Sequence, residues 1–280
     1  MMARRVPIVY GDGRMAAETL TVGIDEVGYG PKLGPLVVAA ACGRGRLSRR
    51  VRVADSKKVF SQATGVGTLE PAVLGYLPAA TFAELLAKLS TTLPDAPWYR
   101  GSLDLPCHPK LDGLEGAWAR LVDPAEYNAA VRAQNKSEFL FEVAAGIINR
   151  VRELHPGPIR FLVGKHGGRH YYLRGIQTRI SPTVLIREET PTRSTYEIPG
   201  ATITFLESAE DRHKLVALAS MIGKYVRECA MRLFNEWWAL RCEGLRRTAG
   251  YGRDGSRFYR EIRSLLPRLN VDPDAVLRLR

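Results

Sequence analysis

Residues 23–42, GIDEVGYGPKLGPLVVAAAC, decide the fold, because two short apolar runs here flank a link rich in glycine and proline. The runs 21–25 and 36–42 have the length and the β-branched content of buried strands. The link 28–35 is short, so the two strands are expected to pair as a hairpin. The sequence therefore predicts a hairpin that carries Asp25 and Glu26 where its first strand ends.

Two adjacent carboxylates at the end of a strand are a candidate metal site. Adjacent strand residues point to opposite faces, so Asp25 and Glu26 reach one ion only where the strand frays or bulges into a loop. Such a pair suits Mg²⁺ or Mn²⁺, which prefer carboxylate oxygen. The alternative is that Asp25 caps the following turn while Glu26 faces water. The dipeptide alone favours that alternative, so the surrounding sequence has to decide.

The rest of the chain alternates between helical and strand patterns. The run Asp123-Pro124-Ala125-Glu126 is a helix start, and its helix is expected to reach about Leu154 with a break near Asn135. Further helices are predicted within 81–93, 210–242, 256–266 and 272–280, and further strands at 161–163 and 201–206. Strands first, then helices and strands in alternation, predict an α/β fold.

The chain has no internal repeat and no clear linker, so one domain with insertions is expected. We interpret 1–20 as a basic N-terminal extension and 21–280 as the domain. The loop-rich stretch near 94–122 and the strand-like stretch near 168–200 are interpreted as insertions, and C-terminal helices are expected from about 243.

Composition indicates the kind of partner and the compartment. The chain has 41 basic and 29 acidic residues, a formal charge of +12, which favours a polyanion such as nucleic acid over a merely solvated basic surface. Four scattered cysteines without a paired spacing indicate a reducing, cytoplasmic setting. No apolar run is long enough for a membrane span, and no secretory signal is evident.

Four ordered motifs give a family resemblance. The segments 23–31 (GIDEVGYGP) and 34–40 (GPLVVAA) together resemble the opening motif of type 2 ribonuclease H. The segment 54–58 (ADSKK) resembles that family's D-S-K-K segment, and 219–228 (ASMIGKYVRE) resembles one of its helices. Gly250-Tyr251 is similar to its later G-Y turn.

This resemblance implies a ribonuclease H-like fold, with a mixed five-stranded sheet flanked by helices. It also implies a nuclease that cleaves the RNA strand of RNA/DNA hybrids with two divalent ions, Mg²⁺ or Mn²⁺, held by four carboxylates. Asp25 and Glu26 match the first two carboxylates, and Glu210 matches the fourth, with Asp211 as the fallback. The implied catalytic and metal-binding residues are therefore Asp25, Glu26 and Glu210.

The third carboxylate position is occupied by Gly164, which offers no ligand. Lys165 is expected to add positive charge beside the ions. His166, two residues on and facing the same way, is a weak substitute ligand. A tight turn is the other interpretation of Gly164, since glycine permits one.

The resemblance also implies a substrate-binding surface. Gly28 and Gly30 bring backbone N–H groups close to a sugar-phosphate chain. Tyr29 stands where the family has an arginine that senses the ribose 2′-hydroxyl, so preference for a single ribonucleotide is open. The other implied contacts are Ser56, Lys57, Lys58, Lys224 and Tyr251.

The sequence offers two alternatives to an active nuclease. A dinucleotide-binding loop at Gly28-Tyr29-Gly30 fails, because a helix should open at those glycines and a strand-like run follows instead. A non-catalytic protein that binds hybrids or duplexes on the same fold stays open, and Gly164 favours it. We expect a monomer in either case.

Overall fold

The computed structural model describes residues 18–61 and 63–279. Most of the predicted basic extension, residues 1–17, lies outside the described residues. Two antiparallel strands open the described chain, β1 (Leu20–Val27) and β2 (Leu36–Gly43). The predicted hairpin is therefore confirmed.

One mixed sheet organises the fold, in the order β3-β2-β1-β4-β7-β6-β5. β1, β4 and β7 run parallel to one another, and the remaining neighbours are antiparallel. The other strands are β3 (Gly116–Val122), β4 (Ile159–Gly164), β5 (Leu185–Glu189), β6 (Arg193–Ile198) and β7 (Ala201–Leu206). The α/β class and the mixed sheet are confirmed, whereas the expected count of five strands is wrong, because the sheet has seven.

The two additional strands extend one edge of the sheet. β5 and β6 form a hairpin within 168–200, and β6 pairs with β7 from Arg193 opposite Leu206 to Ile198 opposite Ala201. The segment interpreted as an insertion thus becomes part of the sheet. Without β6, the outer edge of β7 would present unpaired backbone N–H and C=O groups. The extended segment that precedes β7 in sequence pairs with these groups.

The loop character expected over 94–122 is wrong at its C-terminal end, because 116–122 is β3. Its side chains alternate between two cores: Ala117, Ala119 and Leu121 face one, and Trp118 and Val122 face the other. This alternation was hidden by the prolines and glycines that precede it.

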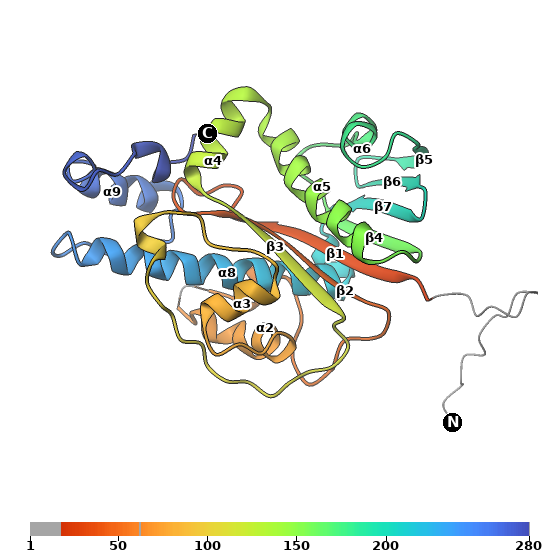
Figure 1. Cartoon of the computed structure of the whole chain (residues 1–280), viewed down its shortest axis with the longest axis horizontal. Coiled ribbons are helices and arrows are strands. Elements are labelled where there is room, and N and C mark those ends of the chain that lie inside the picture. The colour runs from red at the N-terminus through yellow and green to blue at the C-terminus, as the bar shows by residue number, and fades with distance from the viewer. Residues whose placement is uncertain (1–17, 62, 280) are drawn as a thin grey trace, which may run out of the picture.

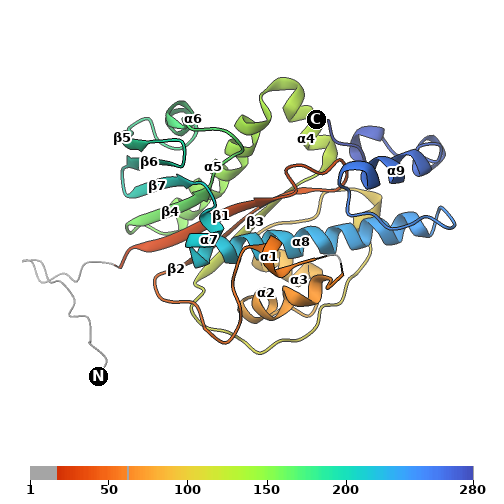
Figure 2. The same ribbon diagram turned by 180° about the vertical axis from the view of Figure 1, so that it is seen from behind.

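Helices cover both faces of the sheet (Figures 1 and 2). On one face the long helix α8 (Lys214–Ala239) packs on β1 and β2, and the helical segments 69–77, 82–89 and 258–262 contribute to the same core. On the other face α5 (Lys136–Leu154) covers a second core. The remaining helices are α1 (Ser56–Val59), α2 (Glu70–Tyr76), α3 (Phe82–Lys88), α4 (Pro124–Ala133), α6 (Leu173–Arg179), α7 (Ala209–Arg212) and α9 (Gly252–Ile262).

Local capping explains where the central helices break. Asp123 caps α4 by accepting a hydrogen bond from the backbone of Glu126, and Asn135 caps α5, so the predicted break near Asn135 is confirmed. The pattern over 210–242 is less continuous than expected, because His213 is extended and separates α7 from α8.

The C-terminal segment differs from the prediction. The expected helix over 272–280 is one 3₁₀ turn, η4 (Pro273–Ala275), followed by a bridge between Leu277 and Leu33. Asn128 of α4 fixes this segment by donating to the carbonyl of Leu277 at 2.8 Å and accepting from the backbone of Leu279 at 2.7 Å. None of the described helices combines the length and the apolar character that a membrane crossing requires.

Candidate active site

Asp25 and Glu26 lie in the last third of β1 and are half-buried. The pairing of β1 with β2 continues in register to Val27, so the expected fraying or bulge is wrong. On the other side, pairing with β4 ends where Ile24 faces Val163. The edge of β1 is therefore open from Asp25 onward, and side chains that start on opposite faces can meet beyond the end of β4.

Gly164, the last residue of β4, lies beside both carboxylates. A Cβ atom built on it would be 3.0 Å from Oδ1 of Asp25 and 3.7 Å from Oε2 of Glu26. Gly164 does not have a positive φ and it pairs regularly with Leu206, so the tight-turn interpretation is wrong. The backbone does not require glycine here, and any side chain would point at the carboxylate pair.

A chain of hydroxyl groups orients Asp25. Ser220 of α8 hydrogen-bonds to the Asp25 carboxylate, and its Oγ lies 2.9 Å from Oγ of Ser56. Ser56 is buried at the start of α1, whose cap Asp55 accepts a hydrogen bond from the backbone N–H of Lys57 at 3.0 Å. Ser56, predicted to touch substrate, thus faces Ser220 and positions Asp25 through it.

Glu210 approaches the pair from α7, directly after β7. Its side chain is 16% exposed, and its Oε1 lies 4.0 Å from Nζ of Lys57. The negative charge of Glu210 contributes to raised pKa values at both Asp25 and Glu26, which places the three groups within one electrostatic environment. Lys57 lowers the same two pKa values and is 83% exposed, so its ammonium stands at the solvent side of the three carboxylates.

Asp211, the fallback ligand, has a different partner. Its carboxylate accepts a hydrogen bond from Lys58 at 2.5 Å, and both side chains are exposed. Neighbouring helical residues point about 100° apart at 3.6 residues per turn, so Glu210 and Asp211 face different groups. The structure supports Glu210 over Asp211 as the carboxylate beside Asp25.

Burial makes the carboxylate pair hard to ionise. Loss of hydration is the largest cause, and it raises the pKa of Asp25 to about 7, with a further increase from Glu210. Burial and then the charge of Asp25 raise the pKa of Glu26 well above its usual value. A carboxylate pair with raised pKa values is typical of a functional site, because an added cation would stabilise both charges.

The donor chemistry fits a divalent cation in part. Asp25 and Glu26 offer the oxygen ligands that Mg²⁺ and Mn²⁺ prefer. Within 18–61 and 63–279, however, no group of three or more His, Cys, Asp or Glu side chains is arranged to hold a metal ion. The third position is Gly164, so the ligand set is incomplete at the place where the sequence predicts the gap.

The two residues after Gly164 are not placed as expected. His166 is buried in an aromatic cluster with Phe141, Tyr172 and Phe205 on the α5 face, and burial lowers its pKa to about 3. It does not face the same way as Gly164, because β4 has ended. Lys165 hydrogen-bonds to the carbonyls of Thr190 and Pro191 and to the ring of His170, so its ammonium is held at the β5–β6 turn.

The glycine loop after β1 has a fixed shape. Gly28 has φ +88°, and a Cβ there would clash with the Pro35 carbonyl and the Arg227 side chain. Gly30 has open space around it, so its backbone is accessible as predicted. Arg278, 4% exposed, donates hydrogen bonds to the carbonyls of Gly28 and Tyr29. The loop is therefore held open by a buried cation from the C-terminal segment.

Tyr29 lies at the rim of the carboxylate site. The negative charge of Glu26 contributes to its raised pKa, after burial and Tyr127. The ammonium of Lys136 stands 4.0 Å from the centre of its ring. Tyr29 also lines a pocket of about 360 Å³ with the backbone of Gly167 and Gly168. Its ring is thus placed beside a shallow surface next to the carboxylates.

Lys224 and Tyr251 lie on the side of the loop nearest α8 and α9. Lys224 is 12% exposed, donates to Glu228 at 2.7 Å and stacks on Phe60 at 4.0 Å, so an internal partner already neutralises it. Glu228, interpreted as a surface or capping carboxylate, is 15% exposed and also pairs with Arg227. Tyr251 is 42% exposed above the Arg227 guanidinium, and its ring remains available to a ligand.

Ser220, Arg227 and Arg278 are important to the site, although sequence patterns did not single them out. Ser220 stands in a recognised motif, but its bond to Asp25 depends on the packing of α8 on β1. Arg227 is fully buried and donates to the carbonyls of Leu33 and Ala249 at 3.1 Å each. The sequence signal for Arg227 was its place in the 219–228 motif, which gives no indication that its side chain is buried.

Comparison with known proteins gives one family match, to part of the chain. The sequence model of the family described as ribonuclease HII matches residues 22–66, which contain Asp25, Glu26 and the 55–58 segment. No curated protein sequence matches the chain.

The chain is similar to solved structures along nearly its whole length. One is a PCNA:RNase HII complex from Archaeoglobus fulgidus, with 22% identity, a TM-score of 0.54, and coverage of 93% of this chain and 94% of that one. Another is ribonuclease H2 from Pyrococcus horikoshii OT3, with 18% identity, a TM-score of 0.48, and coverage of 92% of each chain. A third is Bst-RNase HIII in complex with Mn²⁺, with 18% identity, a TM-score of 0.48, and coverage of 94% of this chain and 67% of that one.

The first of these structures carries the fold comparison, and the family match falls on the strand, loop and serine–lysine segment that build the carboxylate site. Residues 22–66 are thus similar in sequence to ribonuclease HII, and the likeness along the whole chain shows a ribonuclease H-like fold.

Proposed function

We propose that this protein binds RNA/DNA hybrids in the cleft around Asp25 and is a ribonuclease H-type endonuclease whose hydrolysis of the RNA strand is impaired. The observation that carries the proposal is the position of Gly164, where a Cβ would lie 3.0 Å from a carboxylate oxygen of Asp25. A side chain is absent from the one place where it would complete the carboxylate set.

Each residue of the site has a role in this proposal. Asp25 and Glu26 supply anionic oxygen ligands for Mg²⁺ or Mn²⁺, and Glu210 supplies a third carboxylate across the cleft. Ser220 keeps Asp25 oriented. Two bound divalent ions would activate water and stabilise the leaving oxygen in a complete site.

Other residues serve recognition of the substrate. Lys57 and Lys58 are exposed beside the carboxylates and are proposed as phosphate contacts, together with the open backbone at Gly30. Tyr29 and Tyr251 present ring surfaces on either side of the glycine loop, suited to a sugar or base. Lys224 is a weaker candidate because Glu228 already holds it.

The test compares Gly164→Asp with Gly164→Ala and the unmodified protein on a labelled RNA/DNA hybrid. We expect Gly164→Asp to raise cleavage with Mg²⁺ about 10²-fold or more, which corresponds to about 3 kcal/mol of transition-state stabilisation. Gly164→Ala adds the Cβ without a ligand, so it should not raise cleavage. Mn²⁺, which tolerates poorer ligand sets, should support some activity of the unmodified chain.

A second readout does not depend on activity. Gly164→Asp places a further negative charge beside two raised carboxylates, so it should lower the thermal midpoint in EDTA more than Gly164→Ala does. Adding Mn²⁺ at about 100 times its Kd should recover about 2.7 kcal/mol in the Asp variant. Equal, robust cleavage by all three proteins would show that Gly164 is not a vacated ligand position.

A non-catalytic hybrid- or duplex-binding protein on this fold is the second candidate. The absence of a three-ligand group among the described residues favours it. Tight hybrid binding without cleavage by either the unmodified protein or Gly164→Asp would support this candidate. Failure of the unmodified protein to bind any hybrid would refute both.

The compartment and assembly also remain proposals. All four cysteines are free, and Cys42 and Cys229 are buried, which agrees with the reducing environment of the cytoplasm. We propose a monomer, which sedimentation at micromolar concentration would test.

A further inference from the structure

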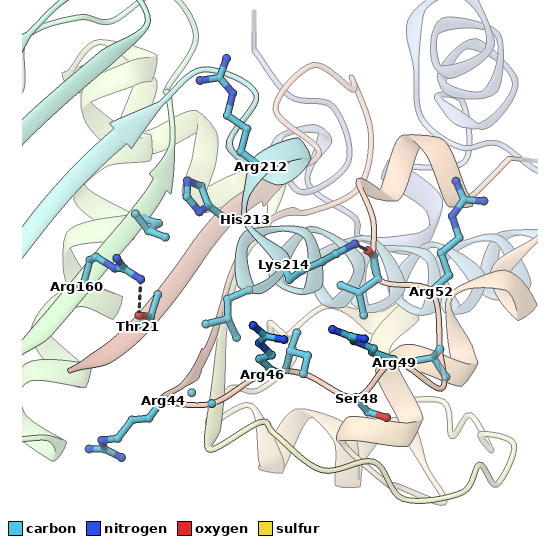
Figure 3. A pocket seen from close by; sticks show the side chains of 17 residues that line it. Thr21, Arg44, Arg46, Ser48, Arg49, Arg52, Arg160, Arg212, His213 and Lys214 are labelled. Carbon is cyan, nitrogen blue, oxygen red and sulfur yellow. Dashed lines mark hydrogen bonds between the residues drawn. The ribbon is translucent and has the colours of Figure 1, made fainter. Parts of the chain in front are cut away.

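A cavity of about 620 Å³ opens at the end of β1 opposite to Asp25. Thr21 at the start of β1, the segment 43–53 after β2, Arg160 of β4 and the α7–α8 junction at 212–215 line it (Figure 3). These parts of the chain are distant in sequence and are brought together by the parallel pairing of β1 with β4. The cavity is separate from the carboxylate site.

The lining of this cavity is strongly basic. It contains no Asp or Glu, and its cationic residues are Arg44, Arg46, Arg49, Arg52, Arg160, Arg212 and Lys214. Arg44 pairs with Glu115, and Lys214 donates to the carbonyl of Val53 at 2.6 Å. Among the described residues no carboxylate forms an ion pair with the other five arginines.

The free arginines are arranged around one space. Figure 3 shows Arg46 and Arg49 below Lys214, whereas the side chains of Arg44, Arg52 and Arg212 extend away from these two. The pKa of His213 reflects the positive charge around it. Burial lowers this pKa, and Arg160, Arg193 and Arg212 lower it further. An uncompensated cluster of guanidinium groups is a favourable environment for phosphate oxygens, which arginine binds through two parallel hydrogen bonds.

The position of the cavity favours the backbone of a nucleic acid over a free anion. Thr21 and Asp25 are four residues apart on one strand, about 13 Å at about 3.3 Å per residue, which is about four base-pair steps of a duplex. The short helix α7 carries Glu210 toward the cleft and Arg212 toward the cavity. Lys57, 83% exposed and 4.0 Å from Glu210, adds a positive charge on the side of the carboxylate site.

We propose that this basic cavity is a second phosphate-binding site, which holds the sugar-phosphate backbone of a duplex about four base pairs from the carboxylate cleft. The proposal rests on the proposed function, because the cleft fixes where the duplex lies. It assigns Arg46, Arg49, Arg52, Arg160 and Arg212 to phosphate contacts outside the cleft.

The experiment measures binding of hairpin-closed RNA/DNA hybrids in EDTA, with stems of about 3 and about 20 base pairs, the shorter being too short to span the distance from the carboxylate site to the cavity. The test variant is Arg46→Gln/Arg49→Gln, which removes two exposed charges that have no ion-pair partner among the described residues. The control is Arg263→Gln/Arg268→Gln, which removes two exposed charges at the α9 end. Matched thermal midpoints check folding.

We expect the cavity variant to lose about tenfold in affinity for the long stem and to flatten the slope of log affinity against log salt by about 0.9 per lost phosphate contact. Binding of the short stem, and both stems with the control, should be nearly unchanged. Equal losses in the two double variants, or equal affinity of the unmodified protein for both stems, would overturn the second site while leaving the proposed function in place.

A final arm identifies the source of the phosphate. If inorganic phosphate raises the thermal midpoint of the unmodified protein but not of the cavity variant, while long-stem affinity is the same for both, the cavity binds a small phosphate compound and the duplex assignment is wrong. If the unmodified protein binds neither stem, the proposed function fails first, and this inference fails with it.

Discussion

At the scale of single residues, Asp25 shows how the folded protein disfavours an ionised carboxylate at the site. Burial and the charge of Glu210 disfavour the ionised form of this carboxyl, whereas Ser220, Lys57 and the backbone N–H of Glu26 favour it. Such a group is stabilised by a proton or by a cation. The metal-free protein therefore has a stability that depends on pH in a predictable direction.

The pH dependence follows from the raised pKa of Asp25. Its value is 3.8 without the fold and about 7 within it, so the folded state binds this proton more tightly. The stability that protonated Asp25 contributes is full below about pH 3.8 and is lost as the pH rises toward about 7. We expect Asp25→Asn to raise the free energy of unfolding by about 1–3 kcal/mol near pH 8 and to change it little near pH 4.

Urea unfolding in EDTA at the two pH values measures this effect. Asp211→Asn is the control, because Asp211 is exposed and paired with Lys58 rather than buried in the cleft. A gain for Asp25→Asn of the same size at both pH values would contradict the assignment of the effect to ionisation.

Sequence patterns predicted the identity of the site residues better than their contacts. Asp25, Glu26 and Gly164 were predicted to belong together, and Gly164 lies against both carboxylates. The prediction that His166 faces the same way as Gly164 was wrong. The direction of the His166 side chain depends on where β4 ends, which is set by the pairing of β4 with β7. Likewise, the bond from Ser220 to Asp25 exists only through tertiary packing.

At the scale of elements, the close approach of α8 to β1 determines the site. A Cβ on Gly23 would lie 2.2 Å from the backbone nitrogen of Val216 and 2.3 Å from the carbonyl carbon of Leu215. Glycine therefore lets helix and strand pack backbone to backbone, and this contact carries Ser220 to Asp25.

Gly23→Ala and Gly30→Ala form a matched pair of tests. Gly23→Ala has to push α8 away from β1, so we expect a loss of about 3 kcal/mol or more in unfolding free energy. Gly30→Ala meets no atom within 4 Å and has no positive φ, so its unfolding free energy should stay within about 0.5 kcal/mol. Thermal and urea unfolding give both values, and similar losses for the two variants would contradict the packing argument.

Elements with strong local signals were predicted well. The caps at Asp123 and Asn135 mark α4 and α5, and the range 201–206 is β7. β5 was harder to predict, because Leu185 and Ile186 are exposed and its pairing with β6 contains an irregularity. The helix predicted over 272–280 was wrong for a related reason. The conformation of this segment is set by contacts with Asn128 and Leu33 rather than by its own periodicity.

At the scale of the whole molecule, the formal charge of +12 governs the encounter with a polyanion. We expect hybrid affinity to fall steeply with salt, with a slope near −0.9 for each phosphate contact. Fluorescence anisotropy at several salt concentrations measures that slope. A flat titration would contradict the polyanion interpretation of the charge.

The hydrogen bond from Arg278 to the carbonyl of Gly28 joins residues 250 positions apart. At a translation rate of about 5–20 residues per second, roughly 12–50 s pass between synthesis of the loop and synthesis of its anchor. During that interval the carbonyl of Gly28 lacks this donor, and for most of it β1 also lacks α8. We therefore expect the nascent chain to contain Asp25 and Glu26 long before its glycine loop is fixed. The carboxylate site should become able to bind a nucleic acid only after residue 278 has left the ribosome.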